Sequence, residues 1–195
     1  MPMLVPRRSL VALAFVGGLL LLGLVSLLRT TGIAGLPPGG DFTLQSADGP
    51  LALHDLRGRV VLLFFGYTDC PGICPTALAD QGAAFRLLKP EELERVAGIF
   101  VSVDPERDTP AHLKAYAGSF HPLIRGVTGA PADLQALARR YGVLYARQPA
   151  DGSGQYAVDH SSETFVIGPD GRLAARLPYG TPPEALVAEL RRGLR

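Results

Sequence analysis

Runs of apolar residues, separated by turn and capping residues, divide most of the chain into alternating strands and helices. Residues 59–65 and 98–103 are nearly continuous apolar runs, which are typical of strands buried on both faces. Other segments have apolar residues at helical spacing, which indicates helices. Their predicted starts are marked by Pro75, Thr109-Pro110 and Pro182, since proline is favoured in the first turn of a helix. The predicted strands are 42–45, 51–53, 59–65, 98–103, 124–128, 143–147, 163–167 and 172–177, and the predicted helices are 75–89, 110–120, 132–141 and 182–192.

The order of these elements predicts an α/β sandwich whose central sheet is mixed and flanked by helices. Strands separated by helices favour parallel pairing, whereas the closely spaced strands near the end of the chain favour antiparallel pairing. No repeat or second linker divides residues 41–195. We therefore expect one domain over 41–195, preceded by a separate segment over 1–40.

The first forty residues have the pattern of a membrane anchor. Residues 10–28 contain nothing more polar than glycine and one serine, and a helix of this length is about 28 Å long, close to the hydrocarbon thickness of a bilayer. Arg7 and Arg8 precede the run, which favours a cytoplasmic N-terminus and an external domain. A cleaved signal peptide is the alternative, with a poor cleavage site near residue 34. Residues 30–40 are rich in Gly and Pro and predict a tether.

Composition and charge exclude several classes of protein. The 195 residues include 19 Lys plus Arg and 18 Asp plus Glu, so the chain offers no strongly basic surface for nucleic acid. With only two cysteines, it is not a disulfide-stapled mini-protein.

Cys70 and Cys74 fall between a predicted buried strand and the helix that follows it. Residues four apart on a helical turn lie on one face, close enough to form a disulfide or to bind one metal ion. A helix N-terminus also favours thiolate. Two structural thiols, or one inert disulfide, remain the plain alternative at this point.

His160 is the histidine best placed to complete a metal site. It directly precedes the apolar strand 163–167, which could lie beside strand 59–65 and bring His160 over the cysteines. His54, His112 and His121 have the context of surface residues. Two thiolates and one imidazole suit Cu(I), and zinc with water in an open position remains possible.

Three sequence blocks in this order and spacing resemble the SCO/SenC family. They are FFGYTDCPGICPT at 64–76, VSVDPERDTP at 101–110, and VDHSS at 158–162 followed by GPDG at 168–171. The resemblance covers essentially all of 41–195 and implies a thioredoxin-like fold after one N-terminal transmembrane helix. It also implies single-pass attachment to the inner (cytoplasmic) membrane, with the domain on the periplasmic side.

The same resemblance implies a copper site, as Cu(I), Cu(II) or both, formed by Cys70, Cys74 and His160. The two cysteines would also form a redox-active disulfide, and the protein would assist assembly of the dinuclear copper site of cytochrome c oxidase subunit II. Periplasmic copper carriers and thiol-disulfide proteins are the other implied partners. Asp69 and Gly72 depart from residues common in the family, and neither is a ligand position. The acidic loop 104–108 has the pattern of a turn and helix cap, while the resemblance places it near the copper site.

Other activities remain open from the sequence. A membrane-tethered thiol-disulfide oxidoreductase is the nearest alternative, although its usual motif has two residues between the cysteines and this chain has three. A thiol peroxidase would have Thr three residues before its reactive cysteine, where this chain has Tyr67 or Pro71. A metallochaperone is the favoured interpretation, with enzymatic activity left open.

Overall fold

β3 (Val60–Gly66) lies at the centre of a five-stranded sheet in the computed structural model, which describes residues 36–195. The strand order is β5-β4-β3-β8-β9, in which β3, β4 and β5 are parallel and β8 and β9 are antiparallel to their neighbours. The other strands are β4 (Val96–Ser102), β5 (Ile124–Val127), β8 (Thr164–Ile167) and β9 (Leu173–Leu177). The predicted mixed sheet is therefore confirmed.

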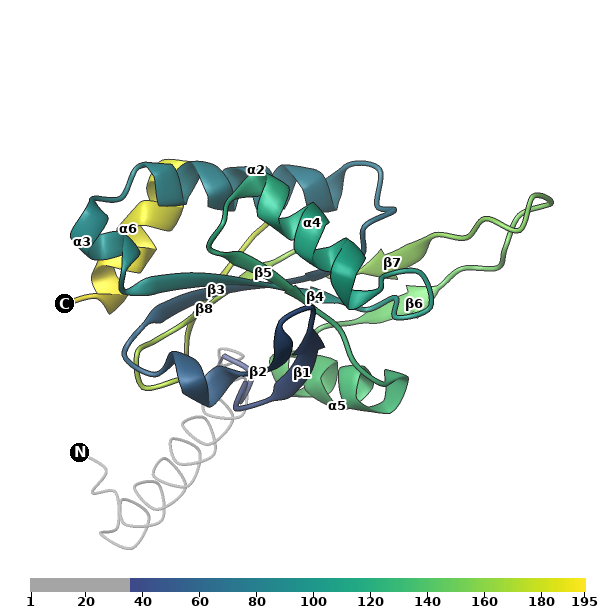
Figure 1. The fold of residues 1–195 in the computed structure, drawn as a ribbon, viewed down its shortest axis with the longest axis horizontal. Helices are drawn as coiled ribbons and strands as arrows, with labels where there is room; N and C mark the ends of the chain where they lie inside the picture. The colour runs from purple at the N-terminus through teal and green to yellow at the C-terminus, as the bar shows by residue number, and fades with distance from the viewer. Residues whose placement is uncertain (1–35) are drawn as a thin grey trace, which may run out of the picture. The chain divides into compact units, whose positions relative to one another are not determined.

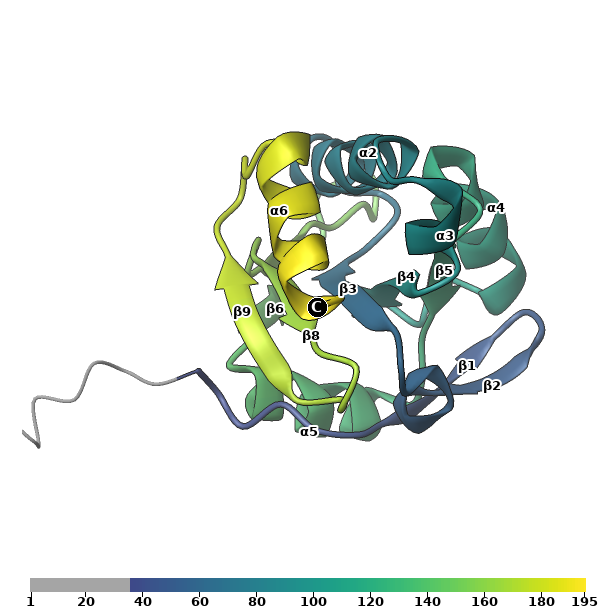
Figure 2. The ribbon, with the colours of Figure 1, turned by 90° about the vertical axis from the view of Figure 1, so that its left-hand side faces the viewer.

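Helices cover both faces of this sheet (Figures 1 and 2). α2 (Ile73–Arg86), α4 (Pro110–Phe120) and α6 (Pro183–Gly193) lie on one face, and α5 (Pro131–Tyr141) lies on the other. The right-handed rule for parallel crossovers explains why α2 and α4 share one face, because they connect β3 to β4 and β4 to β5 in the same direction across the sheet. The prediction of an α/β fold with flanking helices is confirmed.

Small elements complete the described chain. β1 (Thr43–Ser46) and β2 (Gly49–Ala52) form the predicted hairpin, followed by the 3₁₀ helix η1 (Leu53–Leu56). α3 (Pro90–Leu93) is a single turn after α2. β6 (Tyr145–Arg147) and β7 (Val158–His160) pair as a separate two-stranded sheet, whose connecting segment projects from the body (Figure 1).

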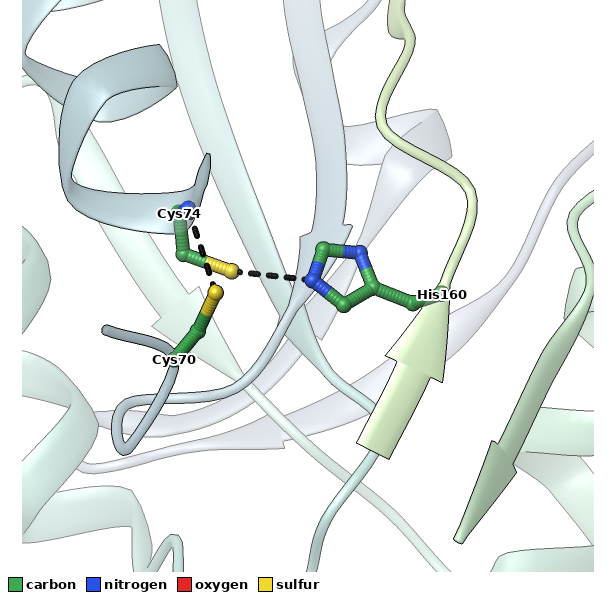
Figure 3. A group of neighbouring side chains, drawn as sticks. All are labelled: Cys70, Cys74 and His160. Atoms are coloured by element: carbon green, nitrogen blue, oxygen red, sulfur yellow. Dashed lines mark hydrogen bonds between the residues drawn. The ribbon is translucent and has the colours of Figure 1, made fainter. Parts of the chain in front are cut away.

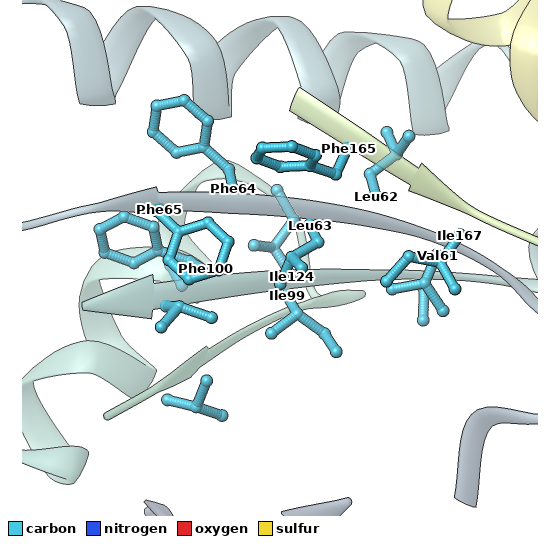
Figure 4. Close-up of a cluster of buried hydrophobic side chains, with 14 of the residues drawn as sticks. Val61, Leu62, Leu63, Phe64, Phe65, Ile99, Phe100, Ile124, Phe165 and Ile167 are labelled. Atoms are coloured by element: carbon cyan, nitrogen blue, oxygen red, sulfur yellow. The ribbon is translucent and has the colours of Figure 1, made fainter. Parts of the chain in front are cut away.

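The core is built on β3 and β4, in which all seven residues of each strand are buried. Large side chains from β3, β4, β5 and β8 pack together in Figure 4. The Phe65 ring meets those of Tyr141 and Phe165 at centroid distances of 5.9 Å, which joins α5 to the sheet. Burial on both faces explains why these two strands have continuous rather than alternating apolar sequences.

Two local predictions differ from the structure. The helix predicted to start at Pro75 starts at Ile73, so Cys74 lies in its first turn. Proline is tolerated at the third helical position because the first N–H groups of a helix have no partner within it. The strand predicted at 143–147 belongs to the small β6–β7 sheet rather than the central sheet, and β7 was not predicted.

The predicted membrane segment, 10–28, lies outside the described residues. Within 36–195, no helix is both long and apolar enough to cross a bilayer. Those residues group into one compact unit.

Candidate metal centre

The topology brings the two cysteines and His160 to one end of β3. The chain leaves β3 at Gly66, passes through the loop 67–72 that contains Cys70, and enters α2, whose second residue is Cys74. β8 runs antiparallel to β3 with Thr164 opposite Phe64. The residues just before β8, which include His160, therefore lie where the cysteine loop begins. The predicted proximity of strand 163–167 to strand 59–65 is confirmed.

The donor atoms of Cys70, Cys74 and His160 converge in Figure 3. All three lie within 4.8 Å of one another. The Cys74 Sγ is 3.3 Å from the His160 Nε2, and the Cys70 Sγ accepts a hydrogen bond from the backbone N–H of Cys74 at 3.5 Å. Both cysteines are free thiols in this state. The sequence candidates thus form one cluster.

The orientation of His160 is set by its neighbours. Its Nδ1 lies 2.9 Å from the Ser161 carbonyl oxygen, a contact that places the proton on Nδ1 and directs the Nε2 lone pair toward the cysteines. The rings of Phe64 and Tyr67 stand perpendicular to the imidazole at centroid distances of 6.1 and 5.8 Å. His160 also pairs with Tyr145 across the β6–β7 ladder. The imidazole is therefore preorganised as a ligand through Nε2.

Burial distinguishes the two thiols. Cys70 is 9% exposed, whereas Cys74 is fully buried. Desolvation raises the pKa of the Cys74 thiol well above its ordinary value, so at neutral pH it is protonated and donates its proton toward His160 Nε2. Desolvation at Cys74 thus opposes the thiolate form that the helix N-terminus is expected to favour. A metal bound here must displace this proton.

Gly66 provides the space that the Cys74 sulfur occupies. A Cβ at Gly66 would overlap Cys74 Sγ and would lie 3.1 Å from the Phe100 ring. Gly66 was not among the residues predicted to form the site. The sequence does carry one sign of it: Gly66 is the last residue of a strand that otherwise contains only larger apolar side chains, and a glycine in such a strand often marks a place where another group packs against the backbone.

We expect Gly66→Ala to lower the free energy of unfolding by about 1–3 kcal/mol, because the added methyl group would force the fully buried Cys74 sulfur or Phe100 ring to shift within a packed core. Denaturant unfolding of the reduced protein measures this change. Gly152→Ala is the control, since Gly152 lies in an exposed turn where a Cβ meets nothing within 4 Å, and this variant should change stability by less than about 0.5 kcal/mol. Equal stability of the two variants would contradict the assigned role of Gly66.

The acidic loop 104–108 is hydrogen-bonded to the cysteine loop through Asp108 and Thr68. Asp108, 1% exposed, accepts hydrogen bonds from the Thr68 N–H at 3.0 Å, the Thr68 hydroxyl at 2.5 Å and the Ser102 hydroxyl at 2.5 Å. The predicted helix cap by Thr109 is confirmed, because its hydroxyl oxygen accepts from the His112 N–H. Asp108 therefore positions Thr68, which precedes Cys70, while the next residue, Thr109, caps α4.

The donor set fits a soft metal ion. Thiolate and imidazole are the ligands that Cu(I) and zinc prefer. Bond lengths of about 2.3 Å to sulfur and about 2.0 Å to nitrogen separate the two donors by roughly 3.5–3.8 Å, so the 3.3 Å between Cys74 Sγ and His160 Nε2 needs only a small adjustment. A cavity of about 510 Å³, lined by Cys70, Pro71, Ile73 and residues 157–160, opens the cluster to the surface.

The other three histidines do not join the cluster. His54 pairs with Asp55, and His112 lies 3.1 Å from the Thr68 hydroxyl. His121 packs against Phe85, and burial lowers its pKa. Among the described residues, Cys70, Cys74 and His160 form the one group with metal-ligand spacing.

Comparison with known proteins adds the family. The SCO1/SenC family model matches residues 33–195. The chain belongs to the SCO1/SenC family. The mouse relative "Protein SCO2 homolog, mitochondrial" is 37% identical over 155 residues, which cover 78% of this chain and 61% of that protein. The match thus spans about three fifths of that relative's length.

Solved structures show the same family fold. The copper-bound ScoI of Bradyrhizobium japonicum is 37% identical, with a TM-score of 0.73 over 80% of this chain and 99% of that one. A second similar structure is BsSco, described as having a disulfide switch and as a member of the Sco family of cytochrome c oxidase assembly proteins. It is 25% identical, with a TM-score of 0.64 over 84% of this chain and 96% of that one. The fold implied by the sequence resemblance, thioredoxin-like α/β, is confirmed.

Proposed function

We propose that this SCO1/SenC protein binds one copper ion through Cys70, Cys74 and His160. The convergence of two thiols and one imidazole within 4.8 Å, beside an open cavity, is the observation that carries the proposal. The copper-bound relative from Bradyrhizobium japonicum supports copper as the metal.

Ligand number favours copper over structural zinc. A structural zinc site is normally closed by four protein ligands, and within the described residues the cluster has three. Cu(I) accepts low coordination numbers and prefers thiolates. The site is thereby suited to holding copper while leaving one side open to a partner.

We further propose that the protein serves assembly of the dinuclear copper site of cytochrome c oxidase subunit II. Membership of the SCO1/SenC family supports this role, as does the similarity to BsSco, described as belonging to a family of oxidase assembly proteins. The open side of the metal cluster supplies a route for ligand exchange with an acceptor site.

The redox state of the cysteines should gate copper binding. A disulfide sulfur lacks the negative charge that makes thiolate a strong ligand, so oxidised protein should bind Cu(I) at least about 100-fold more weakly than reduced protein. Competition titration with a chromophoric Cu(I) chelator measures both states under anaerobic conditions. Equal affinities would remove the thiols from the proposed site.

A thiol-disulfide oxidoreductase is the second candidate function. The Cys70 Sγ faces the first turn of α2 and lies within 4.8 Å of the Cys74 Sγ, an arrangement that permits disulfide closure after a small movement. The disulfide switch described for BsSco also supports this candidate. Effects of the His160 variant, discussed below, separate the two functions.

We also propose that residues 10–28 anchor the protein in the inner membrane, with the domain in the periplasm. The apolar run and the preceding Arg7 and Arg8 support this topology. An alkaline phosphatase reporter fused after Arg195 should be active, and a reporter that folds only in the cytoplasm should be inactive. The opposite pattern would contradict the orientation.

A further inference from the structure

We propose that Arg107 is a positioning residue that fixes His160 against the cysteine loop. This inference rests on the proposed copper function. It concerns a residue that contacts none of the three donor atoms and that lies in the loop between β4 and α4.

His160 is carried by β7, which lies outside the central sheet. β7 pairs only with β6 in a two-stranded sheet, and the segment between them projects outward (Figure 1). Just after β7, the Ser161 N–H donates to the Leu144 carbonyl oxygen, and the Leu144 N–H donates to the Ser161 hydroxyl oxygen. The pairing of β8 with β3 brings this part of the chain to the end of β3, but β7 itself has no strand partner in the central sheet.

Arg107 bridges the two segments through one nitrogen. Its Nη1 donates to the Asp69 carboxylate at 3.1 Å and to the Tyr156 carbonyl oxygen at 3.0 Å. Asp69 is adjacent to Cys70, and Tyr156 lies two residues before β7. The bridge thus ties the cysteine side of the site to the histidine side.

Additional contacts fix the guanidinium and the Tyr156 side chain. Arg107 Nε donates to the buried Asp104 carboxylate at 2.5 Å, and the Tyr156 hydroxyl donates to the same carboxylate at 2.8 Å. The Arg107 Cζ lies 3.7 Å from the centroid of the Tyr156 ring. A planar, multiply bonded guanidinium of this kind has a fixed geometry that an ammonium group does not reproduce.

A second route reaches His160 through Tyr67. The Arg107 Cζ lies 5.4 Å from the Tyr67 ring centroid, and the Tyr67 ring packs perpendicular to the imidazole. Residues that orient a metal ligand commonly change metal affinity by about 10–100-fold when replaced. Arg107 is placed to act in this way on His160.

The test uses the full-length protein carrying Arg107→Met or Arg107→Lys. The lysine variant keeps a positive charge beside Asp104, so it keeps the test valid if Arg107→Met fails to fold. In the copper-free reduced protein, NMR should show loss of the ring contacts between His160 and Phe64 or Tyr67. Cu(I) affinity should fall about 10-fold or more, while mild oxidation still closes the Cys70–Cys74 disulfide.

Arg147→Met is the matched control. The Arg147 Cζ also lies 3.7 Å from the Tyr156 ring centroid, but its ion-pair partner is Glu106 and it makes no bond to the cysteine loop. We expect it to keep the His160 ring contacts and to weaken Cu(I) binding less than threefold.

A double-variant comparison identifies the residue through which Arg107 acts. In a His160→Ala background, Arg107→Met or Arg107→Lys should cause little further loss of Cu(I) affinity. Equal losses in both backgrounds, or His160 ring contacts that persist without Arg107, would overturn the inference. If His160→Ala alone leaves Cu(I) affinity unchanged, His160 is not a copper ligand and the proposed three-ligand site is wrong. The NMR ring contacts of His160 in the copper-free Arg107 variants would still show whether Arg107 positions the imidazole.

Discussion

Cys70→Ala and Cys74→Ala are each expected to lower Cu(I) affinity about 10²–10³-fold. Structural zinc sites contribute about 10–16 kcal/mol over four ligands, and the same scale gives roughly 2.5–4 kcal/mol for each ligand lost here. The Cys70 and Cys74 sulfurs are two of the three donors in the cluster. Chelator competition under reducing conditions measures the loss.

The same variants should remove the intramolecular disulfide, because each leaves a single thiol in the chain. Thiol counting before and after mild oxidation checks this expectation. Unfolding curves show whether each variant is still folded, which matters because Cys74 is fully buried and its replacement removes a sulfur from the core. Near-normal copper affinity in either folded variant would contradict the proposed ligand set.

His160→Ala should separate metal binding from thiol chemistry. We expect Cu(I) affinity to fall about 100-fold or more, because one of three ligands is lost, while both cysteines still close a disulfide. His54→Ala is the matched control, since that histidine is exposed and pairs with Asp55 away from the cluster. Chelator competition and thiol counting are measured on both variants.

The oxidoreductase interpretation predicts a different result for the same variant. Disulfide exchange needs the two thiols and not the imidazole, so His160→Ala would then leave oxidase assembly in cells largely intact. Loss of assembly together with retained disulfide closure would favour copper delivery. Unchanged copper affinity would remove His160 from the site.

The central sheet was predictable because burial on both faces leaves a direct mark on sequence. Residues 59–65 and 98–103 are apolar at nearly every position, and they correspond to β3 and β4. β7 is only three residues long and includes Asp159 and His160, so its sequence carries no such pattern. Its position depends on pairing with β6 and on contacts made by Tyr156, which are tertiary features.

The candidate ligands could be predicted from the sequence, but their environment could not. Spacing predicts that Cys70 and Cys74 lie close together, and the structure places Cys70 in the loop before α2 and Cys74 in the first turn of α2. The antiparallel pairing of β8 with β3 brings His160 to them. The raised pKa of Cys74 follows from burial beneath Gly66 and β3, which the thiol spacing does not encode. The role of Arg107 depends likewise on contacts with residues 38 and 49 positions away.

X-ray absorption spectroscopy of the reduced protein loaded with one equivalent of Cu(I) tests the proposed site most directly. The account predicts a first shell of two sulfur donors and one imidazole nitrogen in the wild-type protein, and loss of the imidazole scattering in His160→Ala. A shell with fewer than two sulfurs, or imidazole scattering that persists in His160→Ala, would contradict it.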